Sequence, residues 1–124
     1  MAVLYPGSFD PPHHGHIDIV NQAVQIFGDV VVAAMYYPEK HTGMFTLDER
    51  LGLLEEVFGK VKHVRVVAFP GLAIDAAASV GATAIVKGVR NAGDFDVEQQ
   101  MAQTNYAVSG IRTVYLPSDP SMSF

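Results

Sequence analysis

The chain contains no cysteine, which excludes a disulfide framework and a thiolate metal site. Basic residues are scarce: eight Lys and Arg against thirteen Asp and Glu give a formal net charge of −5, which argues against broad nucleic-acid binding. No apolar run reaches the ~20 residues that span a bilayer, and no basic segment precedes an apolar one at the N-terminus. We therefore expect a soluble cytoplasmic protein. Its 124 residues, 49% of them hydrophobic, suffice for one domain with its own core.

The hydrophobic pattern alternates between strands and helices. Near-continuous apolar runs, typical of parallel strands covered on both faces, occupy residues 2–5, 29–36, 64–69, 82–86 and 113–116. Helices are predicted between them at 17–27, 46–58, 72–79 and 94–108, from three- and four-residue apolar spacing, a capping box and terminal glycines. No repeat or interdomain linker interrupts this order. The pattern predicts an α/β fold, a Rossmann-like doubly wound five-stranded parallel sheet with strand order 3-2-1-4-5.

Such a sheet binds ligands beyond the carboxyl ends of its strands, where the strand order reverses. In the predicted order this point lies between the first and fourth strands. The loops expected there, residues 6–16 and 87–94, are both rich in polar and ionisable side chains. The sequence therefore predicts a site between these two loops.

The first of these loops is the most informative segment of the chain. A short strand leads into the turn Gly7-Ser8-Phe9-Asp10, and His13-His14-Gly15-His16 then opens a helix. Free N–H groups and the helix dipole favour an anion at such a helix start, and Gly15 lets the backbone approach it closely. The segment indicates a protein that handles a nucleotide. The alternative, that these histidines only cap a helix or lie in solvent, stays open and is strongest for His14.

This segment resembles the signature of the nucleotidylyltransferase superfamily, a T/S-F-D turn followed by H/T-x-G-H. Over nearly its whole length the chain further resembles the bacterial phosphopantetheine adenylyltransferase family. That resemblance is carried in register by the blocks at residues 38–40, 44–50, 84–90, 94–98 and 100–105. It implies that ATP and 4′-phosphopantetheine are the substrates, Mg²⁺ accompanies ATP, dephospho-coenzyme A is the product, and the assembly is a homo-hexamer. Neither nucleic acid nor membrane is expected as a partner.

The resemblance also implies a set of site residues. His16 would stabilise the transition state at the α-phosphate, and the cations of the site would bind phosphates. The expected catalytic residues are His16, Lys40, Lys87 and Arg90. The expected ATP-binding residues are Ser8, Phe9, His16, Gly88, Arg90 and Glu98. The expected phosphopantetheine-binding residues are Ser8, Lys40, Leu72, Ala73, Lys87, Met101 and Asn105.

The chemistry that the resemblance implies is direct in-line displacement, which requires no nucleophilic side chain. No Ser-His-Asp or Cys-His arrangement suited to covalent catalysis is present. No spacing of His, Asp and Glu indicates a tightly held metal. The role of Asp10 stays open: it either binds the Mg²⁺ that accompanies phosphates or fixes the turn.

The chain departs from the family at two places. His13 stands where Thr is usual, which gives the H-x-G-H of cytidylyltransferases. The family continues beyond Ser123-Phe124 with a Ser-rich loop and a helix, so we expect an incomplete sequence. The alternatives are a sister transferase such as a glycerol-phosphate cytidylyltransferase or a nicotinamide-mononucleotide adenylyltransferase, an inactive ATP- or coenzyme A-binding protein, and a flavodoxin-like interaction domain.

Overall fold

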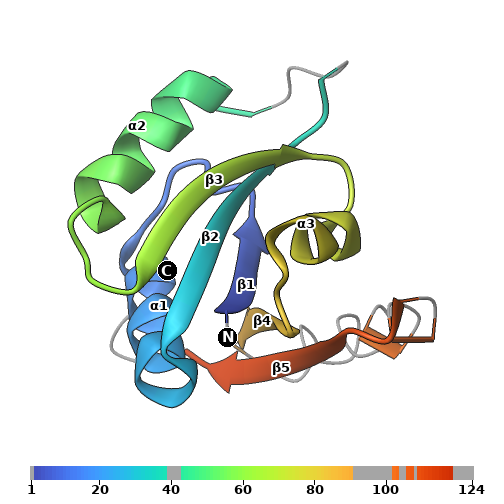
Figure 1. Cartoon of the computed structure of the whole chain (residues 1–124). Helices are drawn as coiled ribbons and strands as arrows, with labels where there is room; N and C mark the ends of the chain where they lie inside the picture. The colour runs from blue at the N-terminus through green and yellow to red at the C-terminus, as the bar shows by residue number, and fades with distance from the viewer. Residues whose placement is uncertain (1, 39–42, 91–101, 104–105, 108, 119–124) are drawn as a thin grey trace.

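The chain folds around one five-stranded parallel sheet with helices on both faces (Figure 1). This computed structural model describes residues 2–38, 43–90, 102–103, 106–107 and 109–118. The strands are β1 (Ala2–Gly7), β2 (Asp29–Tyr36), β3 (Val64–Pro70), β4 (Ala84–Val89) and β5 (Arg112–Pro117). The helices with assigned bounds are α1 (His14–Phe27), α2 (Leu47–Phe58) and α3 (Ala73–Val80). The sheet order β3-β2-β1-β4-β5 confirms the predicted fold class and strand order.

Two strands extend further toward the site than their apolar runs indicated. β1 continues to Gly7, which pairs with Ala34, and β4 begins at Ala84 and continues to Val89. The expected strand at 82–86 was therefore displaced, and Lys87 lies within β4 opposite Tyr115. The reason is that ladder hydrogen bonds depend on the neighbouring strand rather than on side-chain hydrophobicity.

Each face of the sheet is covered by different helices, and the strands alternate between them. Val3, Tyr5 and Val32 pack on one face with residues of α1 and α2. Leu4 and Val31 pack on the other face with residues of α3. This period of two explains why the central strands have continuous apolar runs: both faces of the sheet are buried.

The helix boundaries follow local signals. Thr46 and Glu49 form the predicted capping box at the start of α2, since Thr46 Oγ1 accepts the Glu49 N–H and Glu49 Oε1 accepts the Thr46 N–H. Gly81 ends α3 in the left-handed conformation, at φ 69°, as expected of a C-terminal glycine. The predicted fourth helix lies mostly outside the described residues; residues 102–103, 106–107 and 109 are helical. Among the described helices, none combines the length and apolarity needed to cross a bilayer.

Candidate functional site

The turn between β1 and α1 lies at the carboxyl end of β1, beside β4, where the strand order reverses. Ser8 is exposed in this turn, whereas Phe9 is only 1% exposed. The Phe9 backbone has a φ of 49°, in the left-handed region that non-glycine residues seldom adopt. Its ring makes edge contacts with Tyr5 at 5.4 Å and with His16 at 4.8 Å between centroids. The buried Phe9 ring therefore links the turn to the first residues of α1.

His13 and His16 form a capping box at the start of α1. The His13 Nδ1 accepts the Gly15 N–H at 3.1 Å, and the His16 Nδ1 accepts the His13 N–H at 3.0 Å. The two rings stack with centroids 3.7 Å apart. Both histidines therefore make the capping hydrogen bonds that the sequence left open as one interpretation. His14 is exposed.

This geometry determines the protonation of His16. Burial, and secondarily the neighbouring His13, lowers the pKa of His16 to about 4, so the ring is neutral at pH 7. Because Nδ1 accepts a hydrogen bond, the single proton of the neutral ring resides on Nε2. Burial, Arg90 and His14 also lower the pKa of His13. His16 is therefore a neutral donor at the helix N-terminus rather than an acid.

The lowered pKa of His16 predicts a stability that falls with acidity. The unfolded chain binds a proton at the ordinary histidine pKa of about 6.5, whereas the folded chain does so only near 4, so stability is lost as the pH falls through this window. We expect a loss of about 2 kcal/mol, less than the full shift because the ring is partly exposed. The measurement is the free energy of unfolding in urea, determined for the wild type and for His16→Gln at several pH values between 7.5 and 4. Parallel pH profiles for the two proteins would contradict the prediction.

The fourth strand brings the other predicted residues toward this turn. The Arg90 charge, directly after β4, acts on the pKa of His13, so the guanidinium and the histidine pair belong to one electrostatic environment. Lys87 is half-buried within β4. Gly88 packs under α1, where an added Cβ would lie 3.1 Å from Cγ1 of Ile19. Gly88 thus allows close packing of β4 against Ile19 of α1, a contact that the sequence did not indicate.

Two further residues have structural roles at the turn: Asp10, whose role the sequence left open, and Arg50, which the sequence analysis missed. The Asp10 carboxylate accepts the Met44 and Phe45 N–H groups at 2.9 and 2.8 Å, which favours the turn-fixing interpretation of Asp10. Arg50 of α2 is 8% exposed and donates from Nη1 to the Ser8 carbonyl at 2.7 Å. The signal was present for Arg50: it lies within the apolar stripe of α2, between Leu47 and Leu54.

The other predicted residues belong to other segments or lie outside the described part. Leu72 is exposed directly after β3 and before α3, and Ala73, the first residue of α3, packs against the core cluster of Leu4 and Val31. Lys40, Glu98, Met101 and Asn105 fall outside the described residues. Within the residues described, no group of three or more His, Asp or Glu side chains is placed to hold a metal ion. A cavity lined by Asp29, His63 and Val80 lies at the amino ends of β1, β2 and β3, away from the carboxyl ends where the turn lies.

The arrangement provides neutral donors, cationic side chains and a helix N-terminus at one switch point, which suits a nucleotide phosphate. A family model described as cytidylyltransferase-like matches residues 4–124. The phosphopantetheine adenylyltransferase of Streptomyces coelicolor is 43% identical over 119 residues, which are 96% of this chain and 74% of that protein. The chain therefore belongs to the cytidylyltransferase-like family of nucleotidyltransferases, and within it to the phosphopantetheine adenylyltransferases.

Solved structures with lower identity share the fold. The lipopolysaccharide core biosynthesis protein of Thermoplasma volcanium superposes with a TM-score of 0.66 at 20% identity, over 96% of each chain. A NadR protein in complex with NAD and AMP-PNP superposes with a TM-score of 0.61 at 15% identity, over 95% of this chain and 38% of that one. These likenesses show the fold alone.

Proposed function

We propose that this chain transfers the adenylyl group of MgATP to 4′-phosphopantetheine, giving dephospho-coenzyme A and pyrophosphate. The proposal rests on its similarity to the Streptomyces coelicolor enzyme and on one structural observation. That observation is the neutral His16 ring at the start of α1, whose only ring proton is on Nε2. In the reaction an oxygen of the acceptor phosphate attacks the α-phosphorus, and the bond from that phosphorus to the bridging oxygen of pyrophosphate breaks.

His16 would act as a fixed hydrogen-bond donor to the α-phosphate. Charge concentrates on the phosphoryl oxygens in the transition state, and a donor that is already oriented stabilises this charge without reorganisation. The His13 N–H and the Phe9 ring hold His16 in place. Since the pKa of His16 is about 4, we expect it to donate a hydrogen bond rather than transfer a proton at pH 7.

The surrounding groups fit the proposed binding of two phosphorylated ligands. Arg90 and Lys87 lie at the end of β4, and the exposed Ser8 hydroxyl lies at the end of β1. Gly88 would contribute close approach of the backbone, and the exposed Leu72 with Ala73 would contact the pantetheine arm. Their positions at the carboxyl edge of the sheet support these roles. Glu98 near the ribose, and Met101 with Asn105 at the pantetheine arm, complete the proposed set on the resemblance alone.

Lys40 is proposed to bind the phosphate of the acceptor. A charged hydrogen bond of about 1.5–3 kcal/mol corresponds to roughly 10–100-fold in binding, so Lys40→Ala should raise the KM for 4′-phosphopantetheine by this factor. The KM for ATP should change little. Initial rates at varied acceptor concentration test this, with Lys60→Ala, an exposed lysine before β3, as the matched control. An unchanged acceptor KM removes Lys40 from the site.

The reaction itself is tested by pyrophosphate release from MgATP with and without 4′-phosphopantetheine. Release that depends on the acceptor supports the proposal. Release only with CTP and glycerol phosphate would instead favour the sister transferase to which the H-x-G-H sequence of this chain points. Nucleotide binding without release would favour a binding protein. Mg²⁺ as the metal with ATP, a hexameric assembly and a cytoplasmic location stay predictions from the sequence.

A further inference from the structure

The buried Arg50 guanidinium joins the carboxyl ends of two strands to α2. Its Nη1 donates to the Ser8 carbonyl at 2.7 Å and to the Met35 carbonyl at 3.3 Å. Among the described residues no carboxylate forms an ion pair with it, and its Nε has no hydrogen-bond partner. Burial of a cation without a countercharge is costly. The buried face of α2 therefore carries an energetically unfavourable charge, and the hydrogen bonds described for it go to the carboxyl ends of β1 and β2.

The bond to Ser8 determines the direction of the peptide that follows it. In a trans peptide the C=O and the N–H point in opposite directions, so the Phe9 N–H points away from Arg50. No described residue accepts a hydrogen bond from this N–H. The guanidinium also polarises the peptide, because its positive charge lies at the carbonyl end. Both effects leave the Phe9 N–H as an oriented donor beside the exposed Ser8 side chain.

Asp10 attaches the same turn to the segment that leads into α2. Its two carboxylate oxygens accept the N–H groups of Met44 and Phe45. Gly43, at φ 129°, has no room for a side chain, because an added Cβ would collide with Oδ2 of Asp10. Arg50 of α2 thus donates to the turn at Ser8, and Asp10 of the turn accepts from the segment that precedes α2. Together these hydrogen bonds hold Phe9 in its unfavourable backbone conformation.

We propose that Arg50 is a positioning residue of this site: it orients the Ser8–Phe9 peptide so that the Phe9 N–H donates to a phosphate oxygen of the bound nucleotide. The identity of this anion rests on the proposed function. Arg50 itself touches no reacting atom, so its effect is on the placement of the donor. A misplacement of about 1 Å at a reacting centre costs on the order of 100-fold in rate.

The kinetic test compares Arg50→Met, Arg50→Lys and Arg65→Met. We expect Arg50→Met to lower kcat for pyrophosphate release about 100-fold per folded molecule, with folding followed by thermal unfolding. Arg50→Lys, which keeps a cation able to reach one carbonyl, should recover at least about tenfold of this. Arg65→Met makes the same chemical change on the exposed surface of β3, and its kcat should stay within about twofold of the wild-type value. A folded Arg50→Met with kcat within about threefold of wild type overturns the proposal.

A second measurement needs neither turnover nor a folded Arg50→Met. Wild-type chain labelled with ¹⁵N-phenylalanine has seven phenylalanines, and the Phe9 amide is followed during titration with Mg²⁺ and AMP-PNP. We expect the Phe9 amide proton to shift downfield and to exchange more slowly, and both changes to shrink in Arg50→Lys. A Phe9 amide that does not respond at saturation contradicts the proposal. If the amide responds but no acceptor-dependent pyrophosphate appears, the proposed reaction fails while the role of Arg50 stands.

Discussion

The His16→Ala variant is expected to lose about 10²–10³-fold in kcat for acceptor-dependent pyrophosphate release. The side chain is neutral with its proton on Nε2, so its removal deletes an oriented donor where negative charge develops. The affinity for ATP should fall much less, because the proposed interaction strengthens in the transition state. Steady-state kinetics separate kcat from KM, and calorimetry with AMP-PNP gives the affinity.

Two matched variants control for the capping role of His16. His14→Ala alters the adjacent exposed histidine of the same motif and should leave kcat within about threefold. His16→Gln keeps a side-chain oxygen that can accept the His13 N–H, since glutamine is favoured at this position of a capping box. It should recover the stability of the helix start without recovering kcat. If His16→Ala keeps near-normal kcat, the proposed catalytic role of His16 is wrong.

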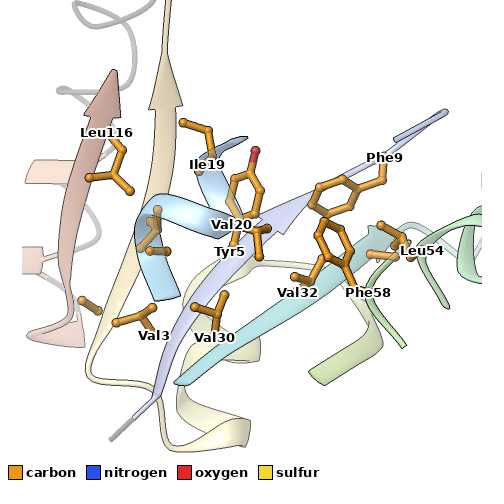
Figure 2. Close-up of a cluster of buried hydrophobic side chains, with 14 residues drawn as sticks. Val3, Tyr5, Phe9, Ile19, Val20, Val30, Val32, Leu54, Phe58 and Leu116 are labelled. Atoms are coloured by element: carbon orange, nitrogen blue, oxygen red, sulfur yellow. The ribbon is translucent and has the colours of Figure 1, made fainter. Parts of the chain in front are cut away.

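The Phe9→Ala variant is expected to lose about 3–5 kcal/mol of unfolding free energy. Phe9 is 1% exposed and belongs to the core cluster that includes Phe58 and Leu54, shown together in Figure 2. Removal of the ring leaves a cavity beside Tyr5 and removes the edge contact that holds His16. Urea unfolding at pH 7.5, where His16 is neutral in both states, measures the stability loss.

The comparison is with Ile26→Ala, in which a 60% exposed side chain of α1 is truncated. The free energy of unfolding of Ile26→Ala should stay within about 0.5 kcal/mol of the wild-type value. Phe9→Leu, which keeps most of the buried volume, should lie between the two. A loss below about 1 kcal/mol in Phe9→Ala would mean that the core closes around the missing ring, and the positioning of His16 would then need another explanation.

The fold was predictable because it follows from local chemistry. Continuous apolar runs such as 29–36 require burial on both faces, and parallel strands joined by helices provide it. The capping box at Thr46 and the terminal Gly81 marked helix ends for reasons confined to a few residues. The error at 82–86 arose because β4 is bounded by its pairing with β5, a partner almost thirty residues further along the chain.

The position of the candidate site in the fold was predictable from its residue types. A hydroxyl, histidines and a glycine between a strand and a helix indicate phosphate chemistry by themselves, and the structure places this turn at the switch point. The role of Asp10 was left open between binding Mg²⁺ and fixing the turn, and the role of Arg50 was missed. The partners of these two residues are 15–42 residues away in sequence and are backbone atoms, which have no residue-specific signature.

The sequence by itself determined the class of fold, the turn proposed to contact the nucleotide and the family of the chain, because each depends on residue types at short spacing. Only the tertiary structure decided the protonation of His16 and the direction of the Ser8–Phe9 peptide. The first depends on how deeply the ring is buried beside Phe9 and on the His13 N–H that occupies its Nδ1. The second depends on a guanidinium brought from α2. Burial and hydrogen-bond direction are properties of packing, and packing exists only in the folded chain.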